Sequence, residues 1–168
     1  MAGDKKSLHP AFAVTNIKNL IPIFLDIKQD EYSSWVFLFQ LHLQAHNFSF
    51  LIDGTSPPPE LDASTILQLD ALCRQWMFAT MAKDLMLMVL KSGTTAKQIW
   101  DHLQRLFQEN KGSRAVTLGS KFVNLKFIDC NSVDDYCDKI QALSHRLSDL
   151  DFPMNENRLV IQLVNGLP

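Results

Sequence analysis

The chain has 168 residues, of which 46% are hydrophobic and 20% charged, and its net charge at pH 7 is −2. This composition is typical of a globular protein with enough apolar side chains for a core, and the length suits one domain or two small ones. A domain that binds duplex DNA usually carries a basic excess, which this chain lacks. A nucleic-acid role would therefore need a local basic patch or additional sequence.

The chain contains three cysteines, Cys73, Cys130 and Cys137. Their odd number and the lack of zinc-ligand spacing argue against a disulfide framework and favour a reducing compartment. Pro22 interrupts the apolar run 20–25, so we expect neither a signal peptide nor a membrane span. Ala2 in place of Gly argues against N-myristoylation. We expect a cytoplasmic protein without a membrane partner.

The first 30 residues read as an irregular arm, in which the stretch 19–27 forms a short strand or lies extended on the body. Helical spacing begins at Asp30 and predicts a helix that ends near Asn47. Its apolar stripe consists of Tyr32, Trp35, Val36, Phe39 and Leu43. A glycine and three consecutive prolines then predict a turn and an extended loop over residues 48–62.

A second helix is expected to begin at Asp62 or Ser64, either of which is a good N-cap. Its main stripe consists of Ile66, Leu69, Cys73, Trp76, Met77 and Thr80. Leu67 and Phe78 fall off this stripe, which predicts burial on more than one face. The segment 81–90 continues this helix or forms a short helix after a break, and Gly93 provides a stop signal.

The segment TTAKQIWDHLQRLFQ, residues 94–108, reads as a one-sided amphipathic helix. Thr95 and Gln98 have the spacing of a capping box. The apolar arc consists of Ile99, Trp100, Leu103, Leu106 and Phe107. Trp100 lies in the middle of this arc, which predicts a core residue.

Three more helices are expected in the last third of the chain. One covers residues 113–126, a longer one is capped by Asn131 or Ser132, and a short one capped by Asn155 ends at Gly166. We find no alternating pattern long enough for a sheet. The sequence thus predicts an all-α fold of six or seven helices, in two small lobes joined by a linker at residues 91–95.

Four motifs follow one another along the chain: EYSSW, FLIDGTSPPPE, TAKQIWDHLQRLFQ, and NSVDDY with a final NGLP. They resemble the Tyr-x-x-Trp, Asp-Gly-Thr, Thr-Ala-x-x-x-Trp and Ser-Val-x-x-Tyr to Gly-Leu-Pro motifs of the Gag capsid region of copia-type LTR retrotransposons, as found in plants. The resemblance covers about residues 16–168. It departs at QDEY, where the family usually has Gly and Asn before the Tyr.

This resemblance implies a capsid-like protein with an N-terminal lobe at residues 1–92, including the arm 1–30, and a C-terminal lobe at 93–168. It implies self-assembly into a virus-like particle shell that packages RNA. The family binds RNA mainly through a Cys-Cys-His-Cys zinc knuckle, which these residues lack. The alternative is a domesticated copy that acts as a monomeric helical adaptor for a peptide or protein partner. An enzyme is a third hypothesis, which the sequence does not favour because it has no Gly-rich phosphate loop, metal constellation or nucleophile elbow.

Two histidines, His42 and His46, are four residues apart on the apolar side of their helix, a spacing that can hold a metal. No Cys or acidic third ligand lies at a supporting offset, so packed histidines with hydrogen-bond partners are the favoured reading. Cys73 and Cys137 lie on apolar stripes, and His145 points away from Cys137. We therefore expect no catalytic, metal or cofactor-binding residue.

Two groups of charged residues need separate explanations. Asp134, Asp135 and Asp138 lie at the start of a helix, where carboxylates favour the helix dipole, so a cation site is not required. Four basic residues lie in a stretch without acidic residues: Lys111, Arg114, Lys121 and Lys126. They are candidates for a weak contact with RNA or a neighbouring subunit, and a solvated helix flank is the favoured reading. The segment MAKDLMLMVL is a further candidate contact surface, with core the favoured reading.

Overall fold

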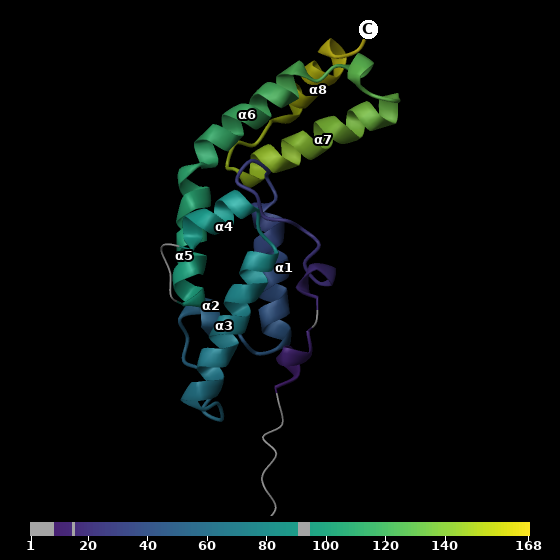
Figure 1. Ribbon diagram of the computed structural model, residues 1–168. Coiled ribbons are helices and arrows are strands. Elements are labelled where there is room, and N and C mark those ends of the chain that lie inside the picture. Colours follow the sequence, from purple (N-terminus) through teal and green to yellow (C-terminus); the bar gives the residue numbers. More distant parts are fainter. Residues whose placement is uncertain (1–8, 15, 91–94) are drawn as a thin grey trace, which may run out of the picture. The chain divides into compact units, whose positions relative to one another are not determined.

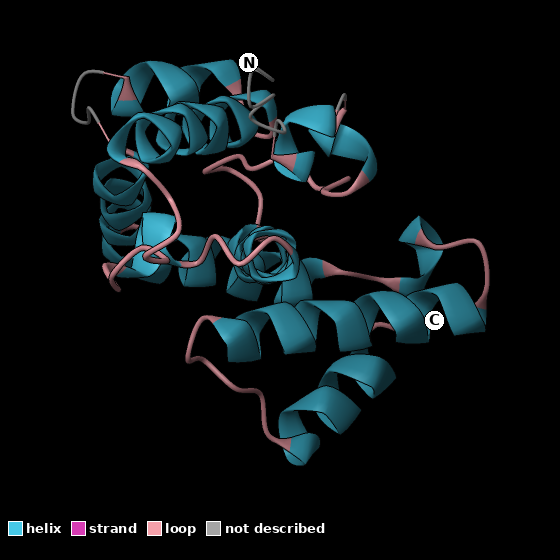
Figure 2. Cartoon of the chain, turned by 90° about the horizontal axis from the view of Figure 1, so that it is seen from below, coloured by secondary structure: helices cyan, strands magenta, loops and turns pink. Residues whose placement is uncertain are grey.

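The computed structural model describes residues 9–14, 16–90 and 95–168, and Figures 1 and 2 show helices joined by loops. The described residues form the α-helices α1 (Tyr32–Ala45), α2 (Phe50–Asp53), α3 (Ala63–Ala79), α4 (Lys83–Val89), α5 (Ala96–Glu109), α6 (Lys111–Asn124), α7 (Val133–Asp149) and α8 (Glu156–Asn165). Three short 3-10 helices are η1 (Pro10–Ala13), η2 (Ile17–Asn19) and η3 (Phe127–Asp129). The predicted all-α class is confirmed.

The chain divides into two compact units, residues 1–105 and 106–168, so that α5 spans the division. This division lies further along the chain than the predicted lobe boundary between residues 92 and 93. Of the predicted linker, residues 91–94 lie outside the described part of the chain. The lobe boundary therefore stays a prediction, and each compact unit is described by itself below.

Around Leu25, the N-terminal arm is extended and pairs with the segment between α3 and α4. Leu25 and Met81 form an isolated parallel β-bridge. The Leu25 N–H donates to the Thr80 carbonyl at 2.8 Å, and the Ala82 N–H donates to the Leu25 carbonyl at 2.8 Å. Leu25 is fully buried. The arm is thus held by backbone hydrogen bonds at the break between α3 and α4, as the extended-arm interpretation predicts.

Three aromatic rings form the centre of the first unit. The ring centroids of Trp35 and Phe39 lie 4.9 Å apart, and Trp100 lies 5.6 Å from each of them. Trp35 and Phe39 are fully buried, and Trp100 is 8% exposed. Aromatic pairs at such distances add stabilisation beyond the area they bury. Trp100 is therefore a core residue, as predicted, and it anchors the first half of α5 in this unit.

Thr80 connects this aromatic cluster to the end of α3. The Trp35 Nε1–H donates to Thr80 Oγ1 at 3.0 Å, and the Thr80 hydroxyl donates to the Trp76 carbonyl at 2.9 Å. Thr80 is 1% exposed, so water does not replace these bonds. A buried indole N–H without a partner would cost free energy. The single hydroxyl therefore satisfies Trp35 and one of the last carbonyls of α3.

Helix α2 was not expected. Its Leu51 and Ile52 are buried, and Gly54 ends it with a φ of +75°, a left-handed conformation that favours glycine. Asp53 Oδ1 accepts hydrogen bonds from both the backbone N–H and the hydroxyl of Thr55, at 2.8 and 2.6 Å. The Asp-Gly-Thr motif is thus a helix end followed by a side-chain turn, which contributes to the fold.

Four predicted N-caps are confirmed by hydrogen bonds from the first turn of each helix. Asp62 caps α3, Ser132 caps α7 and Asn155 caps α8, while Thr95 and Gln98 form a reciprocal capping box at α5. The prediction that Leu67 belongs to a second buried face of this helix was wrong, because Leu67 is 71% exposed. It lies on the outer side of α3, whose buried side is formed by Leu69, Cys73, Trp76 and Met77.

In the second unit, α6 and α7 run side by side and α8 packs against them (Figure 1). The buried core consists of Ala115, Leu118, Phe122, Tyr136, Ile140, Leu147 and Leu150. The Tyr136 hydroxyl donates to the Gln162 carbonyl at 2.8 Å, and the Gln162 Nε2 donates to the Val123 and Leu125 carbonyls at 3.1 Å each. These bonds fix α8 to both other helices.

Gly166 makes the closest approach in this unit. A Cβ atom at Gly166 would lie 1.8 Å from Tyr136 Oη and 3.2 Å from the Leu125 carbonyl oxygen. The Gly166 carbonyl accepts from the Phe127 N–H at 2.9 Å. The absence of a side chain, rather than an unusual φ, is what this position requires. The Ser-Val-x-x-Tyr and Gly-Leu-Pro motifs therefore meet in space.

We predict that Gly166→Ala destabilises the protein by about 1–3 kcal/mol, the usual cost of overpacking a core. Gly119→Ala is the matched control, because nothing lies within 4 Å of a Cβ built there. Because alanine has a higher helix propensity than glycine, this control should stabilise the protein by about 1 kcal/mol in the interior of α6. Urea unfolding followed by circular dichroism measures both, and equal effects of the two variants would contradict the packing of Tyr136 on Gly166.

We predict that Thr80→Val lowers the free energy of unfolding by about 1–3 kcal/mol, because it leaves the buried Trp35 N–H without a partner. Thr80→Ser keeps the hydroxyl and should cost clearly less. Tryptophan fluorescence during urea unfolding is a direct readout, since Trp35, Trp76 and Trp100 all lie in the first unit. A Ser variant as unstable as the Val variant would show that the hydroxyl is not what matters.

Candidate functional site

The four basic residues singled out in the sequence differ in their surroundings. Lys111 begins α6 and pairs with Asp151, with 22% of its side chain exposed. The Arg114 guanidinium lies 5.2 Å from the centroid of the Phe107 ring, a cation–π distance. Lys121 and Lys126 are exposed near the end of α6. Lys111 and Arg114 therefore have partners within the second unit. A role of the four residues in RNA or subunit contact stays a prediction.

Lys121 instead belongs to a pocket between α6 and α7, which we call the basic pocket. It has a volume of about 420 Å³ and brings three cations together, Lys121, Lys139 and Arg146. Leu125, Ala142 and Leu143 supply its apolar lining, and Asn124 and Asp129 complete it. A pocket of this kind suits a ligand with both an apolar and an anionic group.

Sequence reasoning missed Lys139 and Arg146. Both flank the apolar stripe of α7 and are seven residues apart, which places them on the same side of a helix. This seven-residue spacing could have been recognised in the sequence as a basic side of the helix. Lys139 also bonds Asp135 at 3.0 Å, and this hydrogen bond raises the pKa of the lysine above its usual range. Lys139 and Lys121 line the same pocket because α6 packs on α7, and the sequence alone does not show this packing.

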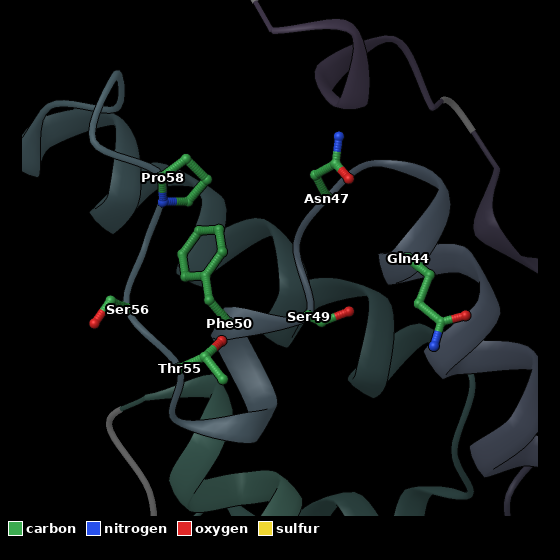
Figure 3. A pocket seen from close by; sticks show the side chains of 7 residues that line it. All are labelled: Gln44, Asn47, Ser49, Phe50, Thr55, Ser56 and Pro58. Carbon is green, nitrogen blue, oxygen red and sulfur yellow. The ribbon is translucent and has the colours of Figure 1, made fainter.

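A second pocket of about 430 Å³ lies in the first unit, and Figure 3 shows its side chains distributed over the end of α1, the turn that follows and the loop after α2. Gln44, Asn47, Ser49, Thr55 and Ser56 line it with neutral polar groups, next to Phe50 and Pro58. These lining residues include no acid, base or thiol. The pocket therefore offers hydrogen bonds, without a general base or a strong nucleophile for catalysis.

His42 and His46 pack among aromatic rings. Their ring centroids lie 4.9 Å apart, and His42 meets Trp76 edge-on at 4.5 Å. The expectation of packed histidines is met, but the expectation that both find hydrogen-bond partners is wrong, because the buried Nε2 of His42 has none. No group of three or more His, Cys, Asp or Glu within the described ranges is arranged to hold a metal.

Burial, together with the nearby His46, lowers the pKa of His42 from its ordinary 6.5 to about 4. The imidazole is therefore neutral in the folded protein, while the unfolded chain takes up a proton as the pH falls below 6.5. Since the unfolded state then binds more protons, stability is complete above this pH and is lost as the pH falls towards 4.

We predict that acidification from about pH 7 to about pH 5 costs the first unit about 2 kcal/mol through His42. His42→Leu should remove most of this loss, and His145→Leu, at an exposed histidine of α7, should retain it. Urea unfolding monitored by tryptophan fluorescence at both pH values gives the comparison. An equal pH dependence in all three proteins would contradict a neutral buried His42.

The surroundings of the three cysteines and of Asp135 explain these residues without a catalytic or metal site. Cys73 is fully buried, and desolvation raises the pKa of its thiol above the usual range, which makes it unreactive. Cys130 and Cys137 are half-buried and free. Asp135 accepts from the Asn131 N–H at 2.9 Å, and this bond, followed by the one from Lys139, lowers the pKa of the carboxyl. These contacts explain Asp135 without a cation.

Apolar side chains are exposed along several helices. In α4, Leu85 and Val89 are buried, while Leu87 is 50% and Met88 46% exposed. The same holds for Phe37 and Leu41 of α1, and for Val160, Ile161 and Val164 of α8. The segment MAKDLMLMVL is therefore part core and part surface. Adjacent exposed apolar side chains of this kind mark interaction surfaces in soluble proteins.

No helix in the described part of the chain is long and apolar enough to cross a membrane. Comparison with known families gives one match: the model of the gag-polypeptide of LTR copia-type matches residues 39–168, more than half of the chain. No curated protein gives a significant match. No solved structure gives one either. The matched range contains Gly54, Trp100, Tyr136 and Gly166, whose structural roles are described above.

Proposed function

This chain belongs to the copia-type Gag family, and on that premise we propose that it is a capsid-like building block that self-assembles into virus-like particle shells packaging RNA. The observation that carries the proposal is the family match, which runs through both compact units. The motifs within it act in packing: Trp100 contacts Trp35, and Tyr136 contacts Gly166. A rigid fold held by such contacts suits a structural subunit.

Exposed apolar side chains provide the surfaces for subunit contacts. Phe37 of α1, Leu87 of α4 and Val164 of α8 are each at least half exposed, at 65%, 50% and 64%. They lie on helices of both units, so one copy has more than one surface to offer. Contacts that are weak one by one gain strength when many form on a closed shell.

RNA packaging and cellular location are parts of the same proposal. Lys121 and Lys126 are exposed, which makes them better placed for RNA or a neighbouring subunit than Lys111 and Arg114. Within the family, the main RNA contact would come from the zinc knuckle. The three free thiols suit the reducing environment of the cytoplasm, where we place assembly.

We predict that the purified chain forms particles or higher oligomers as concentration or salt increases, because salt strengthens apolar burial. Replacing Leu87 and Met88 together by Ser should raise the concentration needed for assembly by about tenfold, the effect of ~1.4 kcal/mol per contact. Lys83→Ser, an exposed change on the same helix, is the control. Light scattering across a concentration series measures all three.

A chain that stays monomeric under all these conditions would contradict the proposal. A monomer that also binds a peptide at one saturable site would favour the adaptor function instead. If assembly is intact in the variant with Ser at both positions of α4, the shell contact lies on another exposed face.

A further inference from the structure

The positive and negative charges of the second unit nearly cancel in number, but several of its cations gather at one pocket. Residues 106–168 contain seven Lys or Arg and eight Asp or Glu, a net charge of −1. Three of the cations line the basic pocket between α6 and α7, where Asp129 is the one acidic side chain among the lining residues. One surface of the unit is thus a cationic pocket with apolar walls.

Residues 149–153, which we call the acidic turn, have the complementary character. Asp149 and Asp151 are exposed. Phe152, which lies between Asp151 and Pro153 in the chain, is 51% exposed. Asp151 has a φ of +63°, and the Phe152 N–H donates to the Leu147 carbonyl at 2.9 Å. Lys111 pairs with Asp151, whose side chain nevertheless remains 82% exposed. The turn therefore presents an exposed aromatic ring directly after two exposed carboxylates.

We propose that the acidic turn of one copy binds in the basic pocket of a second copy, so that this pair of surfaces is a subunit contact. Phe152 would pack on Leu125 and Leu143, and Asp149 and Asp151 would lie near the Lys121 and Arg146 cations. The proposal rests on the proposed function, for which it names the contacting surfaces. A volume of about 420 Å³ accommodates one aromatic side chain with a neighbouring carboxylate.

The pocket fits a protein segment better than RNA. Single-stranded nucleic acid is held by aromatic stacking in a positively charged groove. The described residues that line the basic pocket include no aromatic side chain, and the unit as a whole is slightly acidic. Its apolar lining and its few cations match one hydrophobic side chain, Phe152, preceded by two carboxylates.

The contact is proposed as heterologous: the acidic turn of one copy meets the basic pocket of the next, and these two surfaces share no residue. Each copy then has one free pocket and one free turn after it has bound a neighbour. Head-to-tail contacts of this type propagate into rings or into open chains, depending on the rotation between neighbours. That behaviour suits a particle built from many identical subunits.

The test uses the whole chain and three variants, with sedimentation velocity as the readout. Lys121→Glu reverses one charge of the pocket, and Lys28→Glu makes the same change at an exposed lysine outside its lining. The third variant carries Phe152→Ser and Asp149→Asn. Circular dichroism verifies that each variant is folded. We expect the pocket variant and the turn variant each to self-associate about tenfold more weakly than wild type, and Lys28→Glu to behave like wild type.

Mixing the pocket variant with the turn variant gives the decisive result. One partner keeps an intact turn and the other an intact pocket, so the mixture should form heterodimers that do not grow further. A mixture that stays monomeric, or a Lys121→Glu variant that assembles like wild type, would overturn the inference. Loss of binding to a single-stranded RNA oligonucleotide in Lys121→Glu, with self-association unchanged, would assign the pocket to RNA instead.

The two proposals fail in distinguishable ways. Wild-type particles that the turn and pocket variants leave unchanged contradict this contact and leave the shell function standing. Wild-type dimers or short chains that depend on Lys121 and Phe152, without closed particles, contradict the shell and support the contact.

Discussion

Trp35 is fully buried, and its indole N–H has to be bonded inside the protein because water cannot reach it. Thr80 supplies that bond from the end of α3, and the same residue's carbonyl accepts from the arm at Leu25. Phe39 and Trp100 pack on the ring system that this bond orients. The hydrogen bonds of Thr80 and the ring contacts of Trp35 thus connect the arm, α1, α3 and the first half of α5.

The second unit solves a similar problem with Tyr136. Its hydroxyl is bonded to the Gln162 carbonyl, and its ring lies so close to Gly166 that a methyl group there would collide with it. In both units, residues of the motifs, such as Trp100 and Tyr136, lie in closely packed positions. The motifs therefore encode packing, and the surfaces available for assembly lie on the outer faces of the same helices.

Much of the fold follows from the sequence, since periodicity and capping are local properties. The stripe around Trp100, the Thr95 capping box and the caps of α7 and α8 depend on neighbouring residues alone, and they were predicted correctly. Helix α2 was missed because four residues are too few to show a helical period beside a glycine and three prolines. Leu67 was misjudged because an apolar side chain on a helix does not reveal whether another element covers it.

The functional surfaces were harder to predict for the same reason. The basic stretch at residues 111–126 was visible, but the sequence did not show that Lys111 contacts Asp151 and Arg114 contacts Phe107. The basic pocket needs Lys139 and Arg146 from α7 beside Lys121 from α6. Likewise, the unpaired Nε2 of His42 depends on the burial of the whole ring, for which spacing alone gives no measure.

Trp35, Trp100 and Tyr136 act in packing, while apolar and charged side chains remain on the outside for self-assembly. Negative-stain electron microscopy of the purified chain at high concentration tests it most directly. Closed particles or regular arrays of repeating subunits are the predicted result. A uniform field of monomers, in a preparation that circular dichroism shows to be folded, would contradict the account.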